Sequence, residues 1–204
     1  MSARLNSTAS SPIAARPALR RQLRAQRRAL PPAARAAAER AILATLARSP
    51  WLRPGSAVSL YVARGPEVGT AALCALALRR GCRVYLPRIT DFGAQRMLLY
   101  RDLHRPMRLN RFNIGEPVGA ARIAPQSLAV ALMPLVGFDD RGNRLGNGAG
   151  YYDRLLAWRR SRRGAPLLVG IAFECQRCPP LQATAHDVPL DAVITERGIQ
   201  YFHA

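Results

Sequence analysis

Three glycines spaced by one residue, Gly146, Gly148 and Gly150, separate an apolar run from the start of a helical pattern. The apolar run covers residues 128–133, and Pro134 ends it because proline cannot donate to a sheet ladder. A glycine loop between a strand and a helix directs backbone N–H groups and the positive end of a helix dipole at one point, where an anion can bind. Glycine suits such a loop because it permits positive φ and has no Cβ to hold a phosphate away.

Two charged side chains beside this loop suit phosphate and metal chemistry. Arg144 can neutralise phosphate charge, and Asp153 falls in the expected first helical turn, where its carboxylate can hold Mg²⁺ beside that phosphate. The alternative is a glycine-rich turn and an ordinary helix start, with Asp153 favoured there by the dipole alone. Because short glycine motifs often match by chance, the spacing by itself leaves both interpretations open.

The composition is that of one globular domain with an excess of arginine. The chain has 204 residues, is 49% hydrophobic and carries a formal net charge of +19, and all 31 of its basic residues are arginine. This charge attracts nucleotides, polyanionic cofactors or RNA. The arginines are spread along the chain and are not interleaved with the few aromatic residues, so a nucleic-acid stacking surface is not indicated.

The acidic residues are few, and their positions are informative. Seven of the 12 lie between Asp139 and Glu196, which is where we expect a divalent cation to be held. The Cys175-x-x-Cys178 pair would allow a zinc site together with two further cysteines. However, Cys74 lies in an apolar helical pattern, so buried free thiols are the preferred interpretation.

The chain shows no signal for secretion or membrane insertion. Its arginine-containing N-terminus has no continuous apolar segment, and no apolar run approaches the ~20 residues that cross a bilayer. We therefore expect a cytoplasmic protein without a membrane partner. Residues 1–14, rich in Ser, Ala and Thr, are predicted to be a flexible extension, and residues 15–204 a single domain.

Two helices are expected before the first strand. Residues 16–30 place leucines on a narrow apolar stripe among arginines, and Pro31-Pro32 ends this helix and opens a second over residues 33–48. Arg16 and Arg20 stand one turn apart. The first helix is therefore either a solvated basic face or an arm that binds phosphates.

The remaining pattern alternates strands and helices. A helix is expected over residues 67–80, and strands are expected over 57–62, 84–86, 97–100, 128–133, 167–173 and 191–195. Strand, helix, strand at this spacing builds a parallel sheet, and the continuous apolar run of 167–173 indicates a sheet covered on both faces. The predicted fold is a three-layer α/β/α domain with a mostly parallel sheet, preceded by N-terminal helices.

The full string around the glycine loop, PLVGFDDRGNRLGNGAGYYDRLL, is far more specific than its glycines. It resembles the signature of the 5-formyltetrahydrofolate cyclo-ligase family, and weaker motifs follow in the expected order from Arg16 to Ile199. The resemblance implies a small, generally monomeric, cytosolic enzyme that uses ATP and Mg²⁺. Its reaction converts 5-formyltetrahydrofolate into 5,10-methenyltetrahydrofolate, with ADP and phosphate released, through phosphorylation of the formyl oxygen and attack by N10.

The resemblance also implies roles for individual residues. ATP would be bound by Arg16, Arg20, Arg144, Gly146, Asn147, Gly148, Ala149, Gly150, Tyr151, Tyr152 and Asp153. The reduced folate would be bound by Val62, Glu67, Asn147, Gly148, Ala149, Gly150 and Tyr151. Arg144 and Tyr151 would act in catalysis, and Asp153 and Asp187 would hold Mg²⁺.

Some of these positions depart from the family pattern or keep a second interpretation. The family usually has lysine at position 16, and Ala149 occupies a position that is lysine or glycine in the family. Glu67 also suits a helix start, where the dipole favours a carboxylate. In the turn-rich segment 111–119, Phe112 and Glu116 either border the substrate or belong to a plain loop. His186 is expected either to support the neighbouring metal ligand Asp187 or to be structural.

Two alternatives from other classes follow from the same residues. An arginine-rich RNA-binding protein would show steeply salt-dependent RNA binding and no folate-coupled ATP use. An ATP-dependent ligase or kinase of the same fold would act on another substrate, because the glycine motif specifies ATP and magnesium better than it specifies folate. Val62 and Glu67 alone argue for the folate.

Overall fold

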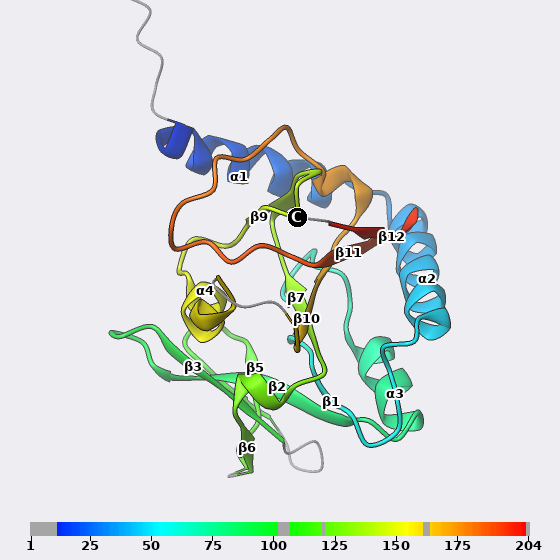
Figure 1. The fold of residues 1–204 in the computed structure, drawn as a ribbon. Helices are drawn as coiled ribbons and strands as arrows, with labels where there is room; N and C mark the ends of the chain where they lie inside the picture. Colours follow the sequence, from blue (N-terminus) through cyan, green and yellow to red (C-terminus); the bar gives the residue numbers. More distant parts are fainter. Residues whose placement is uncertain (1–11, 102–106, 120, 161–163, 203–204) are drawn as a thin grey trace, which may run out of the picture.

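An eight-stranded sheet runs through the protein, as the computed structural model shows for residues 12–101, 107–119, 121–160 and 164–202 (Figure 1). Its strand order is β12–β11–β10–β7–β1–β2–β3–β6. The strands are β1 (Ala57–Ser59), β2 (Arg83–Asp91), β3 (Arg96–Tyr100), β6 (Arg122–Ile123), β7 (Val130–Pro134), β10 (Leu167–Ile171), β11 (Ala192–Thr195) and β12 (Gly198–Tyr201).

The centre of this sheet is parallel and its edges are antiparallel. Strands β11, β10, β7, β1 and β2 pair in parallel, whereas β12 pairs antiparallel with β11, and β3 pairs antiparallel with both β2 and β6. Every residue of β11 and all but the last of β7 are buried, as expected for strands covered on both faces. The predicted α/β fold with a mostly parallel sheet is confirmed.

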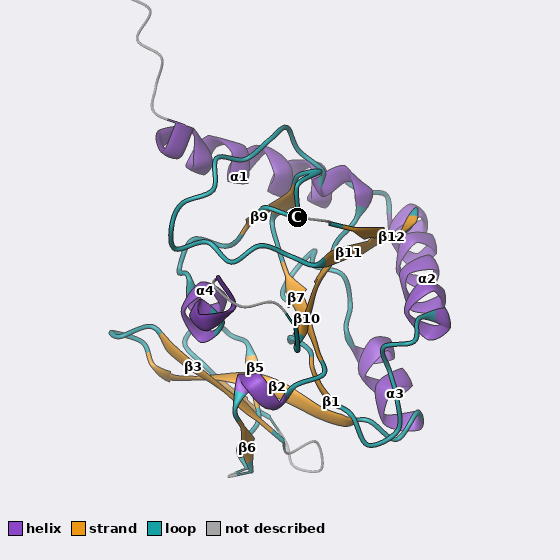
Figure 2. Ribbon diagram, in the orientation of Figure 1, coloured by secondary structure: helices purple, strands orange, loops and turns teal. Residues whose placement is uncertain are grey.

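Helices cover one face of the sheet, and a short helix with irregular segments covers the other (Figures 1 and 2). On the first face, α2 (Pro32–Arg48) buries Ala38, Ile42 and Leu46 against the sheet beside α3 (Ala71–Arg79). On the second, α4 (Tyr151–Leu155) and the chain leading to β11 contribute Leu156, Val188 and Leu190. The larger helical layer gives the sheet a rigid support opposite α4.

The first helix, α1 (Pro12–Ala29), packs on the hairpin of β8 (Gly137–Phe138) and β9 (Arg144–Leu145). Its Leu23 is 2% exposed and lies directly over Gly137, where an added Cβ would come within 2.4 Å of Leu23 Cδ1. Glycine is needed at 137 for this close approach. The contact fixes α1 to the same hairpin that leads into the glycine loop.

The boundaries of several elements differ from the sequence predictions. The helix predicted from residue 67 begins at Ala71, because buried Val68 and the bond from the Thr70 hydroxyl to the Tyr61 carbonyl hold the preceding residues in a loop. The strand predicted to end before Pro87 continues to Asp91. Proline is tolerated there because the pairing of β1 with β2 extends only to Tyr85.

Several short strands were not predicted from the sequence, among them β6, β8 and β9. The C-terminal strand β12 follows β11, which was expected to be the last strand. The turn-rich segment 111–119 contains β5 (Gly115–Glu116), which pairs with β4 (Arg108–Leu109). The first helix begins at Pro12, within the predicted extension, and residues 1–11 lie outside the described part of the chain.

Candidate active site

A cleft of about 990 Å³ opens at the carboxyl ends of the parallel strands. Its floor includes Pro134, the last residue of β7, and Tyr61 and Val62, which follow β1. Ligands of open α/β sheets bind in the crevice outside these strand ends. The position of the cleft therefore follows from the topology of the sheet.

Every residue that the sequence analysis assigned to the site lines this cleft. The set is Arg16, Arg20, Val62, Glu67, Arg144, Gly146, Asn147, Gly148, Ala149, Gly150, Tyr151, Tyr152, Asp153 and Asp187. Phe112, Glu116 and His186 line it as well. The fold thus brings segments from both ends of the chain to one place, and the role of each residue remains a prediction.

The glycine loop needs its glycines at two positions. Gly148 has φ +110° and Gly150 has φ +69°, both in the left-handed region that favours glycine. Ala149, between them, has no positive φ, so its methyl group is accommodated without backbone strain. Helix α4 after the loop has five residues, so we expect anion binding to depend on the loop N–H groups and nearby arginines more than on a helix dipole.

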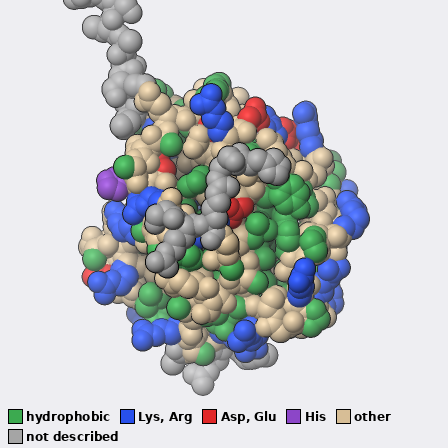
Figure 3. Space-filling model, in the orientation of Figure 1, with side chains coloured by type: hydrophobic (Ala, Val, Ile, Leu, Met, Phe, Trp, Pro, Cys, Tyr) green, Lys and Arg blue, Asp and Glu red, His purple; other side chains and the backbone are tan. Residues whose placement is uncertain are grey.

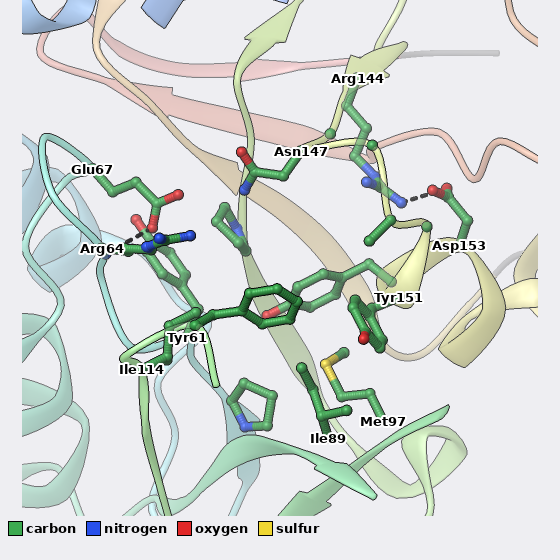
Figure 4. Close-up of a pocket in the computed structure, with 18 of the residues that line it drawn as sticks. Tyr61, Arg64, Glu67, Ile89, Met97, Ile114, Arg144, Asn147, Tyr151 and Asp153 are labelled. Carbon is green, nitrogen blue, oxygen red and sulfur yellow. Dashed lines mark hydrogen bonds and ion pairs between the residues drawn. The ribbon is translucent and has the colours of Figure 1, made fainter. Parts of the chain in front are cut away.

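A buried ion pair joins β9 to α4 beside the loop. Arg144 Nη2 lies 2.5 Å from Asp153 Oδ1, as Figure 4 shows, and the Arg144 side chain is 3% exposed. The Val188 N–H donates to the same carboxylate oxygen at 3.0 Å. Arg144 Nε is buried without a hydrogen-bond partner among the described residues, so Asp153 is the partner that offsets the charge of this guanidinium.

Helix α1 directs a row of arginines at the cleft. Arg16 Nη2 lies 2.7 Å from Asp187 Oδ2, and Arg20 Nε donates to the Gly146 carbonyl at 2.9 Å. Burial would raise the pKa of the Asp187 carboxyl, but the hydrogen bonds from Arg16 and the Thr184 N–H outweigh it, so this pKa lies below its usual range. Burial, followed by the neighbouring arginine charges, lowers the pKa of Arg20.

Arg24 is a site residue that the sequence analysis missed. Its Nη2 donates to Asn147 Oδ1 at 3.0 Å, and the residue lines the cleft. Arg24 follows Arg20 by four residues, as Arg20 follows Arg16, and this helical spacing was the signal that could have identified it.

Two carboxylates are placed where a cation bound to phosphate could be held. Asp153 and Asp187 both line the cleft, and Val188, next to Asp187, bonds to the Asp153 carboxylate. Across the described residues, no three His, Cys, Asp or Glu side chains group as a metal site. Mg²⁺ is commonly held by one or two carboxylates together with phosphate oxygens and water, so this pair suits it.

The opposite wall of the cleft is apolar and aromatic. It comprises Tyr61, Val62, Pro87, Ile89, Met97, Phe112 and Ile114, and Tyr151 lines the same cleft near Met97 (Figure 4). Phe112 packs edge-on against Phe92, with ring centroids 5.7 Å apart. Such a wall suits a flat heteroaromatic ring. The sequence analysis did not assign Ile89 or Met97 to the site. Ile89 lies beyond the predicted end of its strand, and Met97 was predicted only to be part of a strand.

Three polar side chains of the cleft are turned into the protein. Glu116 and Tyr61 hydrogen-bond to other residues, and the Tyr152 hydroxyl is buried. Glu116 Oε1 accepts from the Ile89 N–H at 2.9 Å and from Asn110 Nδ2 at 2.7 Å, which braces the apolar wall. Tyr61 is buried and donates to the Val68 carbonyl at 3.0 Å. Burial, together with the charge of Glu67, raises the pKa of Tyr61 and of Tyr152.

Glu67 lies in a turn ahead of α3, so the interpretation of this residue as a helix-start carboxylate is wrong. Its Oε2 accepts from the Arg64 N–H at 2.9 Å, an interaction drawn in Figure 4. His186 contributes its carbonyl to a bond from Arg160. Cys175 and Cys178 are free thiols, and Cys178 Sγ donates to the Phe138 carbonyl at 3.3 Å.

The excess positive charge is not gathered in one patch on the face seen in Figure 3, where arginines lie apart around its edge. Several arginines are used internally instead. Arg159 pairs with Asp191 at 2.6 Å, and Arg88 lies 3.5 Å from the centroid of the Tyr100 ring. In the part of the chain that the structure covers, no helix is long and apolar enough to cross a membrane.

Comparison with known proteins agrees with this geometry. A sequence profile described as the 5-formyltetrahydrofolate cyclo-ligase family matches residues 12–196. The chain belongs to this family. Among similar members, the 5-formyltetrahydrofolate cyclo-ligase of Haemophilus influenzae is 36% identical over 68% of this chain and 74% of its own length. That of Escherichia coli K12 is 39% identical over 68% of this chain and 76% of its own length.

Solved structures of the family share the fold. The 5,10-methenyltetrahydrofolate synthetase of Aquifex aeolicus, determined by NMR, superposes with a TM-score of 0.77 at 27% identity, covering 93% of this chain and 94% of that one. The synthetase of Mycoplasma pneumoniae gives a TM-score of 0.70 at 23% identity over 89% of this chain and 98% of that one, which supports the fold alone. The family resemblance seen in the sequence is confirmed.

Proposed function

We propose that the protein converts 5-formyltetrahydrofolate into 5,10-methenyltetrahydrofolate, using ATP and Mg²⁺ and releasing ADP and phosphate. The observation that carries this proposal is that one cleft has two chemically different walls. Arginines and the glycine loop form one wall, and apolar and aromatic side chains form the other. A reaction that joins a nucleotide phosphate to a substituent on a pteridine requires both walls in contact with one space.

The formyl oxygen of the substrate is a poor leaving group until it is phosphorylated. In the proposed reaction, the formyl oxygen attacks the γ-phosphorus of ATP, and the bond from that phosphorus to ADP breaks. N10 then bonds to the formyl carbon and loses its proton, and the former formyl oxygen departs as part of phosphate. No nucleophile from the protein is required, so positioning and charge neutralisation are the protein's main contributions.

The wall formed by the arginines and the glycine loop, called the phosphate wall below, would position ATP. Arg16, Arg20 and Arg144 would neutralise the phosphates, and the N–H groups of the loop from Gly146 to Gly150 would donate to them. Asp153 and Asp187 would hold Mg²⁺, which would offset the charge that develops on the transferred phosphoryl group. Because both carboxylates are paired with arginines, ATP and metal would bind by an exchange of partners, with arginines turning to phosphate.

The wall formed by the apolar and aromatic side chains, called the folate wall below, would hold the pteridine against the reacting phosphate. Val62 and the aromatic side chains would pack on the ring, and Glu67 would accept hydrogen bonds from its polar edge. Tyr151 lies beside the glycine loop and near Met97 of this wall, so it would contact both substrates (Figure 4). This shared contact supports its assignment to catalysis.

The test is absorbance in the methenyl-folate band after the protein is mixed with 5-formyltetrahydrofolate, ATP and Mg²⁺. We expect the band to appear with all three present and to be absent when either ATP or Mg²⁺ is omitted. ADP release without the band would favour a kinase or ligase acting on another substrate. RNA binding that weakens steeply with salt, without the band or ADP release, would favour the RNA-binding alternative.

A further inference from the structure

Helix α2 carries two charged side chains that reach the loop of residues 62–70, which holds Glu67. Arg35 and Glu39 stand one turn apart and so lie on the same side of the helix. Arg35 Nη1 donates to the Pro66 carbonyl at 2.7 Å, and the Gly69 N–H donates to Glu39 Oε1 at 2.9 Å. The two bonds hold the loop immediately before Glu67 and two residues after it.

Arg35 is itself held in place by other parts of the fold. Its Nη2 donates to the Arg27 carbonyl at 2.6 Å, and its guanidinium lies 5.1 Å from the centroid of the Phe173 ring. A planar guanidinium can make these contacts together, whereas a lysine ammonium cannot. Arg35 therefore connects the end of α1 and the buried segment that follows β10 to the Glu67 loop.

The charges of Arg35 and Glu39 are directed to the backbone. Neither side chain forms an ion pair with another described residue, although their opposite charges are one helical turn apart. The cation binds a carbonyl and the anion binds an N–H, and hydrogen bonds with a charged partner are stronger than neutral ones. This arrangement restrains the backbone on both sides of Glu67.

Within the loop itself, the Glu67 N–H donates to the Arg64 carbonyl at 3.2 Å, Val68 is buried, and the Thr70 hydroxyl donates to the Tyr61 carbonyl. The Glu67 carboxylate bonds back to the Arg64 N–H, and Tyr61 donates to the Val68 carbonyl. The loop lies between β1 and α3 and belongs to neither a helix nor a strand. The two bonds from α2 add a restraint from outside the loop, one on each side of Glu67.

We infer that Arg35 and Glu39 are positioning residues for the reduced folate and that they act by orienting Glu67 toward the cleft. This inference rests on the proposed function, in which Glu67 contacts the folate. It assigns to α2, which contributes no residue to the cleft wall, a role in substrate affinity. ATP binding on the opposite wall should not depend on the same bonds.

Steady-state kinetics of Glu39→Ala test the inference. We expect the KM for 5-formyltetrahydrofolate to rise about tenfold, while kcat and the KM for ATP stay within about twofold. Glu39→Gln keeps a side-chain oxygen that can accept from Gly69, so it should restore most of the affinity. Arg35→Lys should also raise the folate KM, since lysine lacks the planar fork. The matched control is Arg40→Ala, an exposed charge on the same helix that bonds to no described residue, and it should behave as wild type.

A double-mutant cycle separates positioning from general stabilisation. If Glu39 acts through Glu67, Glu39→Ala should add less than about twofold to the folate KM in a Glu67→Ala background. Equal effects in both backgrounds would overturn the inference, as would a lower melting temperature with an unchanged folate KM. Absence of methenyl product from the wild-type protein would overturn the proposed function and this inference together, whereas normal wild-type turnover confines a failure to the inference.

Discussion

The two walls of the cleft are held together in different ways. The phosphate wall joins segments far apart in the chain through charged contacts, since Arg16 pairs with Asp187 and Arg20 bonds to Gly146. The folate wall joins neighbouring segments through strand pairing and apolar packing, as in β2 with β3 and Phe92 with Phe112. The first wall is built from charged groups that can exchange partners. The second is an apolar surface that is covered either by a ligand or by water.

This difference suggests how each substrate binds. On the phosphate wall, an anion with a bound cation can take over both halves of each arginine–carboxylate pair, so the exchange leaves no charge buried alone. On the folate wall, binding replaces water over a preformed apolar surface. We therefore expect the affinity for ATP to depend on metal and steeply on salt, and the affinity for the folate ring to be independent of metal and to depend only weakly on salt, through Glu67.

Asp153→Asn should have the largest effect, because it changes the phosphate wall in two ways. It removes a predicted metal ligand and leaves the nearly buried Arg144 charge without its partner. We expect kcat to fall by about a hundredfold or more and the free energy of unfolding to fall by about 3 kcal/mol. The absorbance assay and thermal unfolding measure the two. The control is Asp140→Asn, whose carboxylate is 72% exposed and should change neither by much. Full activity of Asp153→Asn would remove this residue from the metal site.

Phe112→Ala should affect the folate wall alone. The substitution removes ring packing against both Phe92 and the substrate, so the folate KM should rise about tenfold and the ATP KM should not change. Steady-state kinetics with each substrate varied in turn measure this. Leu109→Ala, at a 62% exposed position outside the cleft, is the control. Parallel increases in both KM values would contradict the separation of the walls.

The comparison of the walls also shows what the sequence could and could not predict. The glycine loop and its flanking charges were found because a loop between a strand and a helix is a local pattern. The partners of Arg144 and Arg16 were not found, because each pairing depends on how distant segments meet. The extent of the folate wall was underestimated, because Pro87 suggested that the strand ends before Ile89. The missing N–H of Pro87 is tolerated where β1 no longer pairs with β2, a tertiary feature that no local pattern reports.

The fold class was easier to predict than the exact boundaries. Buried apolar runs such as 167–173 indicate a covered parallel sheet whatever the details of the connections. The start of α3 was placed four residues too early because Glu67 resembles a helix-start carboxylate. One bond that excludes it from the helix comes from Tyr61, seven residues before its partner Val68. Another comes from Glu39 on α2, 30 residues before its backbone partner, and no local pattern reports either one.

The Arg16–Asp187 pair should make stability depend on pH in the acidic range. The pKa of Asp187 is lower in the folded protein than in the unfolded chain, so the unfolded chain binds more protons in this range, and stability falls as pH decreases. The contribution is fully present above the ordinary aspartate pKa and is lost as pH falls through the lower, folded-state value. Urea unfolding at pH values from about 5 downward should show a shallower decline in Asp187→Asn than in wild type. An identical slope in the two proteins would contradict the assigned shift.

Ala149→Gly should have the smallest effect. The alanine sits at an ordinary φ, so glycine relieves no backbone strain and only widens the approach to the phosphates. We expect kcat/KM for ATP to change by less than about threefold and stability to decrease slightly, because glycine adds freedom to the unfolded chain. Substrate-saturation curves and thermal unfolding measure both. A large gain in kcat would show that the alanine methyl group obstructs the phosphate.

The docking of α1 has a consequence for the order of assembly during synthesis. This helix is synthesised before the segments that it packs on, because the surface that receives Leu23 includes Gly137, and the partner of Arg16 is Asp187, 171 residues further along. Helix α1 therefore cannot complete its contacts until the segment that contains Asp187 has left the ribosome. If the arginines of α1 bind ATP as proposed, we expect nascent chains that end before Asp187 to fail to retain ATP.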